Sequence, residues 1–379
     1  MSKDNKADLL VLGNVITMDE HKPRAQAVAV KADKIVYVGS AEVAKTLCAD
    51  TTTVLDFGAN FVYPGFLEAH CHPTGAGGMI TLAARMTPDD SPEECVQIMR
   101  EFMDAHPNAT LFRGMGFLER DTPVHARMLD AICPDKPMVI TDCSGHNMWL
   151  NSCALEAFDI DREAIDLWGT DCVRVDEDGK PSGYLSEGPV FHVRSSIAHT
   201  LEELEGALLS WQDYALSRGF TGVYNAGVNL LGEVEQEAYH ALEESGQLKH
   251  YVFAGYTIQD NTDTPERDIQ EIAAKAAAYN SRHFELTGAN ISCDGTLETH
   301  TAWLANEYPD RPGYHGVTRF DDHDKIVRLV KAAAAAGLNV HVHTAGDAAV
   351  TTWVNGIAEA EEQTSNFDMR NALVHLQMA

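Results

Sequence analysis

Basic residues are scarce in this sequence, which contains 28 lysines and arginines against 57 aspartates and glutamates and has a formal net charge of −29 at pH 7. A nucleic acid or an anionic membrane surface would repel such a chain, so neither is expected as a partner. No stretch approaches the ~18 consecutive apolar residues of a membrane span, and the N-terminal residues lack the apolar core of a secretory signal. We therefore expect a protein that is neither membrane-embedded nor exported.

The cysteines form no Cys-x-x-Cys pair, although there are eight of them, and they are scattered along the chain. A chain of 379 residues with 45% hydrophobic residues can build a core without disulfides. This usage favours a reducing compartment, and we expect a cytoplasmic protein. A small molecule is the expected partner, and the sequence leaves open whether the protein is a homodimer.

Residues 1–60 contain short alternating runs separated by glycine, asparagine and aspartate, which predicts a small β-sandwich. The dipeptide Pro64-Gly65 then interrupts the pattern, as expected at a domain boundary, so residues 61–379 are predicted to form a second, larger domain. From about residue 75 to residue 215 the pattern fits no regular repeat, and we interpret this segment as an insertion.

Strands alternate with helices after residue 200, which predicts a parallel sheet, either open and doubly wound or closed into a barrel. Without the insertion, residues 61–379 have room for about six βα units, whereas a closed barrel needs about eight. The chain also ends four residues after His375, in the middle of a predicted strand-to-helix connection. We therefore expect a barrel-like α/β domain that is truncated after its sixth strand, or a fragment of a longer protein.

Two histidines, His70 and His72, end an apolar run that is predicted to be the first strand of the barrel. Side chains two residues apart on a strand point to the same side, so both imidazoles face one point. His341 and His343 repeat this spacing on a later strand, with His343 nearer its carboxyl end, and His375 ends the last strand. A lone histidine at a strand end is more often an ordinary hydrogen-bonded residue, but the carboxyl ends of barrel strands share one rim. Together these histidines predict a metal site there.

Two other polar residues are candidates for the wall of the pocket. His146 and Asp294 each follow a predicted strand, which would place them at the same rim. Two simpler explanations stay open, because His146 could cap the inserted strand and Asp294 could belong to a tight turn.

Four motifs occur in order along the chain: Pro64-Gly-Phe-Leu-Glu-Ala-His-Cys-His-Pro, Cys293-Asp-Gly-Thr-Leu-Glu-Thr-His-Thr-Ala-Trp-Leu, His343-Thr-Ala-Gly-Asp-Ala-Ala-Val and Val374-His-Leu-Gln. They resemble motifs of the amidohydrolase superfamily and, within it, of the YtcJ-like branch, which includes N-substituted formamide deformylases. The resemblance implies a TIM-like (β/α)8 barrel with a composite β-sandwich, to which residues 1–60 contribute the N-terminal part. It also implies a divalent metal, most often zinc, and hydrolysis of an amide or formamide C–N bond by metal-activated water.

By this resemblance His70, His72, His343 and His375 are the metal ligands. Family members also carry an aspartate after the eighth strand, which ligates the metal and shuttles the proton; the sequence ends before that position, so no catalytic residue is assigned.

The resemblance also bears on the number of metal ions. Many members carry a lysine on the fourth strand whose carbamate bridges two metals, and this sequence has Asn290 there. An asparagine cannot form a carbamate, which favours one ion over two. If a second metal position is nevertheless filled, Glu187 is a candidate to supply the ligand in place of the lysine. Glu187 could equally be an ordinary hydrogen-bonded carboxylate at the rim.

Two alternatives to amide hydrolysis remain open at this stage. The chain could bind a metal and be catalytically impaired, because of Asn290 or because the strand-eight aspartate is absent. The same site could also catalyse deamination, isomerisation or decarboxylation, because a barrel and its ligands do not fix the substrate.

Overall fold

The computed structural model describes residues 6–258 and 262–378, and the chain divides into two compact units, Met1–Phe66 and Leu67–Ala379. The first unit is a four-stranded sheet with strand order β3-β2-β1-β4 and one short helix. Its elements are β1 (Leu9–Ile16), β2 (Arg24–Lys31), β3 (Lys34–Gly39), α1 (Ala41–Thr46) and β4 (Thr53–Val62). The described residues of this unit hold one sheet, so the predicted sandwich stays a prediction.

The second unit is built on a six-stranded sheet with strand order β16-β15-β14-β13-β12-β5. Neighbouring strands from β12 to β16 are parallel, as the alternation of strands and helices predicts. The strands are β5 (Phe66–Cys71), β12 (Phe220–Ala226), β13 (Tyr251–Thr257), β14 (Phe284–Ser292), β15 (Asn339–Thr344) and β16 (Ala372–His375).

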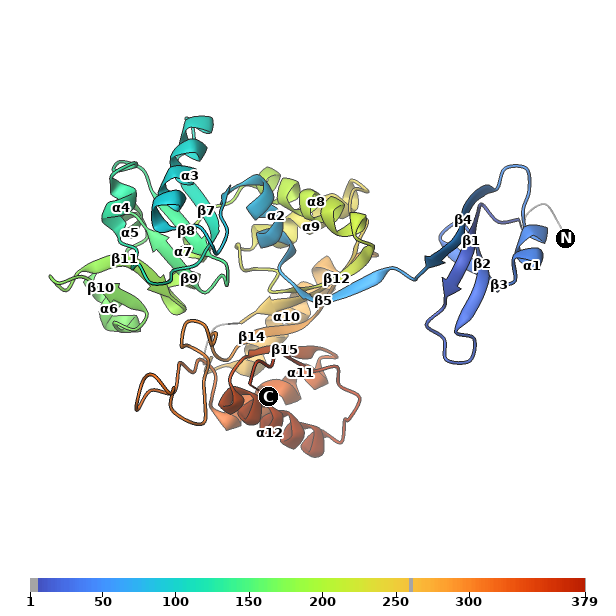
Figure 1. Ribbon diagram of the computed structural model, residues 1–379. Helices are drawn as coiled ribbons and strands as arrows, with labels where there is room; N and C mark the ends of the chain where they lie inside the picture. The colour runs from blue at the N-terminus through green and yellow to red at the C-terminus, as the bar shows by residue number, and fades with distance from the viewer. Residues whose placement is uncertain (1–5, 259–261, 379) are drawn as a thin grey trace. The chain divides into compact units, whose positions relative to one another are not determined.

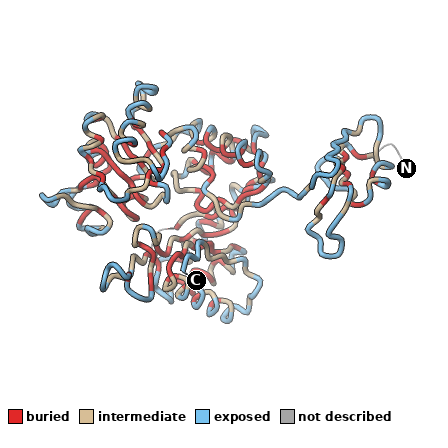
Figure 2. Tube along the Cα trace, in the orientation of Figure 1, coloured by how far each residue is buried: buried red, intermediate tan, exposed pale blue. Residues whose placement is uncertain are grey.

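Amphipathic helices precede or connect these strands and bury their apolar faces against the sheet, which forms the largest core of the molecule. They are α8 (Leu201–Ser217), α9 (Val234–Glu244), α10 (Pro265–Tyr279), α11 (His323–Ala335) and α12 (Asp347–Thr364). Thr200 caps α8 and forms a capping box with Glu203. Helices α11 and α12 lie side by side (Figure 1), and Figure 2 shows the buried strands running through the middle of this unit.

The parallel sheet is strongly curled. In a flat sheet of six strands the two edge strands would lie about 24 Å apart, because neighbouring strands are spaced by about 4.8 Å. The edge strands are β5 and β16, yet the ring centroids of His70 and His375 are only 4.8 Å apart. The α/β fold with a barrel-like sheet is therefore present, whereas closure into an eight-stranded barrel stays a prediction.

The sequence pattern of the insertion fits no regular repeat, but its strands assemble into one sheet. It forms a mixed sheet with strand order β10-β11-β9-β8-β7-β6. Its strands are β6 (Ala84–Arg85), β7 (Phe112–Phe117), β8 (Met138–Asp142), β9 (Asn147–Leu150), β10 (Val173–Val175) and β11 (Pro181–Ser186), and its helices are α2 (Pro73–Thr81), α3 (Pro92–Ala105), α4 (Ala126–Asp130), α5 (Ser152–Ala157), α6 (Arg162–Trp168) and α7 (Gly188–Ser196). Strands of two to six residues are too short to show a clear period of alternation.

Helix α2 begins directly after His72 and packs closely on α8, so this contact positions the end of β5. At Gly77 a Cβ atom would lie 1.9 Å from the carbonyl oxygen of Ala207, whereas at Gly78 the nearest neighbour of a Cβ atom would be Leu82, at 3.8 Å. Only glycine at position 77 therefore allows the two helices to come this close.

We expect Gly77→Ala to lower the free energy of unfolding by about 1–3 kcal/mol, the usual cost of overpacking. Gly78→Ala is the matched control in the same helix, and it should leave stability unchanged or raise it by up to about 1 kcal/mol because alanine favours helix. Urea unfolding of both variants measures the difference. Equal stability of the two variants would contradict the proposed helix contact.

Candidate metal centre

The four histidines predicted as ligands come together at the carboxyl end of the parallel sheet. The ring of His70 contacts those of His72 and His375, at centroid distances of 5.2 and 4.8 Å. The ring centroids of His343 and His375 are 4.2 Å apart. Strand register explains the last contact, because His375 pairs with Thr344, the neighbour of His343. Three strands and the loop after β5 thus supply one cluster of imidazoles.

A fifth histidine, His341, lies beneath this cluster and contacts one of its members. Its Nε2 is 2.8 Å from Nδ1 of His70, and the two rings are stacked. The ring of Tyr224 packs on the other side of His341, at 4.2 Å between centroids. His341 lies farther from the strand end than His343, as predicted, but its contact with His70 was not predicted. The sequence feature that pointed toward this contact is the His-x-His spacing of β15, which also occurs in His70-Cys-His72.

In the described part of the chain, no three His, Cys, Asp or Glu side chains already converge as a complete metal cage. The nitrogen chemistry nevertheless fits a divalent ion, because Nε2 of His70 is buried and has no hydrogen-bond partner within residues 6–258 and 262–378. A neutral imidazole has one N–H, so a His70 that donates from Nδ1 to His341 keeps a lone pair on Nε2. Such a lone pair, beside three other imidazoles, is the donor that zinc and similar ions take.

The histidines of the cluster are held in the neutral form that ligands require. Burial, followed by the neighbouring rings of His72 and His375, lowers the pKa of His70 to about 3. Burial and the ring of His70 lower the pKa of His341 to about 3, and burial places the pKa of His343 well below its usual range. Burial, and to a smaller extent neighbouring basic side chains, also lowers the pKa values of His72 and His375. Both residues keep exposed surface, and both line the cavity described next.

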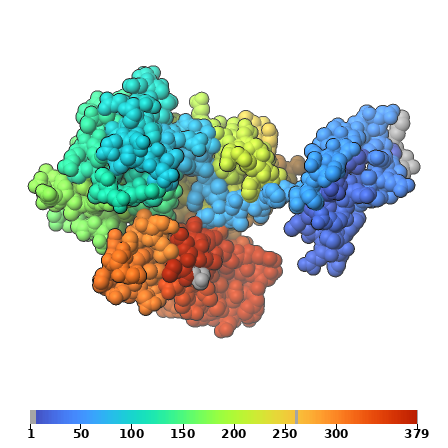
Figure 3. All heavy atoms as spheres, viewed as in Figure 1, coloured from blue at the N-terminus to red at the C-terminus, as the bar shows by residue number. Residues whose placement is uncertain are grey.

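The cluster opens into a cavity of about 860 Å³, which lies within the size range of small-molecule sites. The four histidines and His146 line it, together with Asn290, whose Nδ2 donates to Oγ1 of Thr257 at 3.1 Å. The insertion forms one wall of this cavity. The space-filling view shows the insertion, coloured cyan to green, against the orange loop that follows β14 (Figure 3).

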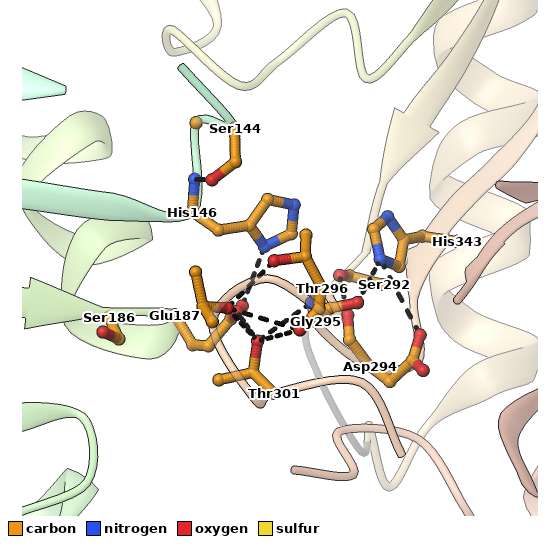
Figure 4. A network of polar contacts seen from close by, with 12 residues as sticks. Ser144, His146, Ser186, Glu187, Ser292, Asp294, Gly295, Thr296, Thr301 and His343 are labelled. Atoms are coloured by element: carbon orange, nitrogen blue, oxygen red, sulfur yellow. Dashed lines mark hydrogen bonds and ion pairs between the residues drawn. The ribbon is translucent and has the colours of Figure 1, made fainter. Parts of the chain in front are cut away.

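Glu187 is a buried carboxylate at the junction of the insertion and this loop (Figure 4). One oxygen lies 3.0 Å from Nδ1 of His146 and 3.5 Å from Arg319, and the other accepts a hydrogen bond from Thr301 at 2.7 Å. Burial alone would raise the pKa of Glu187, but His146, Arg319 and Thr301 outweigh it and lower the pKa to about 2. The backbone of Glu187 has φ = 58°, which is unfavourable for a residue other than glycine and concentrates strain beside the cavity.

Asp294 lies beside the cluster and is completely buried. Its carboxylate accepts hydrogen bonds from the backbone N–H groups of Ala345, Gly346 and Trp303, and one oxygen is 3.7 Å from Nε2 of His343. Burial raises the pKa of Asp294 to about 6 in spite of these hydrogen bonds. This residue therefore holds the loop after β15 against the loop after β14, and so fixes the backbone around His343.

Glu235 is a cavity-lining carboxylate that the sequence analysis missed. It accepts hydrogen bonds from Thr74 and Asn225, and burial raises its pKa to about 7. It lies in α9, outside every strand-end motif, so no spacing in the sequence pointed to it.

Comparisons with known proteins agree with this geometry. The chain is 25% identical to the putative amidohydrolase YtcJ of Bacillus subtilis and 26% identical to the N-substituted formamide deformylase of Arthrobacter pascens, and it covers 68% of each relative while 97% of the chain is matched. A solved structure of an uncharacterized metal-dependent hydrolase from Pyrococcus horikoshii is 22% identical and matches the fold with a TM-score of 0.70 over 94% of this chain and 68% of that one.

The described residues contain no helix that is long and apolar enough to cross a membrane. The model of the amidohydrolase family matches residues 53–379, which include both sheets of the second unit and every histidine of the cluster. The resemblance predicted from the strand-end motifs is confirmed, and the chain belongs to the amidohydrolase family.

Proposed function

We propose that this chain is a metal-dependent hydrolase that cleaves a non-peptide C–N bond, in an amide or a formamide. The observation that carries the proposal is the cluster of neutral histidines at the sheet end, which lines the cavity and in which Nε2 of His70 has no hydrogen-bond partner among the described residues. Membership of the amidohydrolase family supports it, as does the similarity to a formamide deformylase.

The divalent ion, with zinc as the favoured metal, would be held by His70, His72, His343 and His375. When bound, it would polarise the substrate carbonyl and lower the pKa of a water molecule toward neutrality. We infer one ion per chain, because Asn290 occupies the position where a carbamylated lysine would bridge two. Asn290 is engaged by Thr257, and Glu187 is engaged by His146, Thr301 and Arg319.

We assign the transfer of protons to His146, with Glu187 as its positioning residue. The hydrogen bond to Glu187 occupies Nδ1, so the proton on that nitrogen is fixed and Nε2 is left to accept a proton from the reacting water. The ring of His146 lines the cavity and lies 5.1 Å from that of His343, which places it beside the proposed ligands. The low pKa of Glu187 keeps the carboxylate ionised, as an orienting group must be.

A hydrolysis screen tests the function. We expect the 379-residue chain to release amine from at least one N-substituted formamide or amide when zinc is supplied, to lose the activity in EDTA, and to regain it on adding zinc back. Turnover of none of the substrates by the zinc-loaded chain would contradict the proposal. Bound metal without turnover would favour the alternative of a metal-binding, catalytically impaired protein.

Metal content tests the ligands independently of activity. We expect about one zinc per chain in the wild type and a loss of most of it in His70→Ala, because the replacement removes the unpartnered nitrogen. His240→Ala is the matched control, because His240 is a half-exposed residue of α9 that pairs with Glu244. Mass spectrometry of the dialysed proteins gives the stoichiometry. Equal zinc content in the two variants would rule out His70 as a ligand.

Replacement of Glu187 tests the proton-transfer assignment. We expect Glu187→Gln to lower kcat about 10-fold to 100-fold at unchanged zinc content, with little change in KM, because His146 loses its ionised partner. Glu119→Gln removes another arginine-paired carboxylate of the insertion, the partner of Arg174, and should retain kcat. Steady-state kinetics of both variants decide the point, and similar kcat values for the two would refute the assignment.

A further inference from the structure

The cavity is lined by positive charge although the chain as a whole is strongly acidic. Its net charge is −29, yet among the described residues the charged side chains on the cavity wall are three arginines, Arg113, Arg194 and Arg319, and one carboxylate, Glu235. Burial raises the pKa of Glu235 to about 7, so near pH 7 this carboxylate is only partly ionised and offsets only part of the positive charge. A cavity with this lining attracts a negatively charged ligand.

Two of the three arginines already form hydrogen bonds or ion pairs within the protein. Arg194 donates to the carbonyl oxygen of Gly145 at 2.6 Å, and Arg319 donates to Oγ of Ser292 at 3.2 Å and pairs with Glu187. Both guanidinium groups also lie over the ring of Phe191, at 5.3 and 4.4 Å from its centroid. These contacts build the wall of the cavity and leave Arg113 as the cation to consider for a ligand.

Arg113 lies on β7, which is part of the insertion sheet, and its side chain faces the cavity. Its Nε is buried and has no hydrogen-bond partner among the described residues. A guanidinium cannot be deprotonated in a protein, so this nitrogen is a buried donor that lacks an acceptor. The acidic side chain that acts on Arg113 electrostatically is Glu203, and one oxygen of Glu203 already accepts the N–H of Thr200 at the start of α8.

His199 lines the same wall as Arg113, and it too has a buried nitrogen without a hydrogen-bond partner among the described residues. Its Nδ1 is buried without a hydrogen-bond partner in the described chain, and its ring lines the cavity. Burial and the charge of Arg113 lower the pKa of His199 to about 4, so the ring is neutral near pH 7 and can donate from one nitrogen. Two residues that line the same cavity, one of them a cation, therefore each carry a buried nitrogen without a hydrogen-bond partner in the described chain.

We propose that Arg113 and His199 form a subsite that binds an anionic oxygen group, a carboxylate or a phosphate, at one end of the substrate. A guanidinium and an adjacent imidazole together supply the charge and the donors that such a group accepts. This inference rests on the proposed function for the rest of the molecule, since the same substrate presents its C–N bond to the histidine cluster. The substrate class is then an amide or formamide that carries an anionic group.

Binding of three matched probes tests the subsite. They are 4-(formamidomethyl)benzoate, 4-(formamidomethyl)phenyl phosphate and the neutral 4-(formamidomethyl)benzamide. Calorimetric titration of the whole chain in EDTA prevents turnover, so it measures binding alone. We expect at least one anionic probe to bind the wild type about 10-fold to 100-fold more tightly than the benzamide, as a charge-assisted contact provides. The tighter of the two anions identifies the group.

Substitutions then connect this preference to the two residues. We expect Arg113→Gln to remove the preference for the anion and to leave the affinity for the benzamide unchanged, and His199→Gln to reduce the preference. Arg162→Gln is the matched control, because it removes the same charge from an exposed arginine of α6 that pairs with Asp166. Thermal unfolding identifies a variant that fails to fold, and Arg113→Lys, which keeps the charge, should then retain part of the preference.

The outcomes separate this proposal from the proposed function. Equal binding of the three probes by the wild type, or an equal loss of affinity for all probes in Arg113→Gln, would overturn the subsite even if formamides are hydrolysed. An anion preference that depends on Arg113 supports the subsite even if no probe is hydrolysed with zinc, and in that case it is the proposed function that fails.

Discussion

The contact between the rings of His70 and His375 depends on a constraint that shapes the whole second unit. The two residues lie on opposite edge strands of a six-stranded sheet, and they meet because that sheet curls through most of a circle. Helices packed on its outer side, together with the close approach of α2 to α8, hold the curvature. Each strand then contributes its carboxyl end to the same rim, which is how residues about 300 positions apart reach one another.

Crowding of imidazoles at this rim has an electrostatic consequence. Burial disfavours a proton on each ring, and the neighbouring rings disfavour it further, so the pKa values of His70, His341 and His343 are lowered and these rings are neutral near pH 7. The contact of His70 with His341 occupies Nδ1 of His70, and Nε2 is left without a hydrogen-bond partner in the described chain. The surrounding carboxylates Glu187 and Asp294 are each occupied by their own hydrogen bonds, which keeps their charge in fixed positions.

The sequence predicted those features of the fold that have a local period. The helices and strands after residue 200 and the histidines at strand ends follow from spacing along the chain. It did not predict the sheet of the insertion, whose strands are too short to show alternation, nor the buried carboxylate of Glu235. Arg113 and His199 were missed for a related reason: they are 86 positions apart, and only the tertiary fold makes them neighbours.

The cavity draws its two walls from different sheets, one parallel and one mixed. The histidines belong to the parallel sheet and its adjoining loop, whereas Arg113 belongs to the insertion. Substitutions in the insertion sheet can therefore change one wall of the cavity while the parallel sheet keeps the histidine rings in place. Exchanging the segment from β6 to α7, residues 84–196, for that of a homologue is therefore a route to new selectivity.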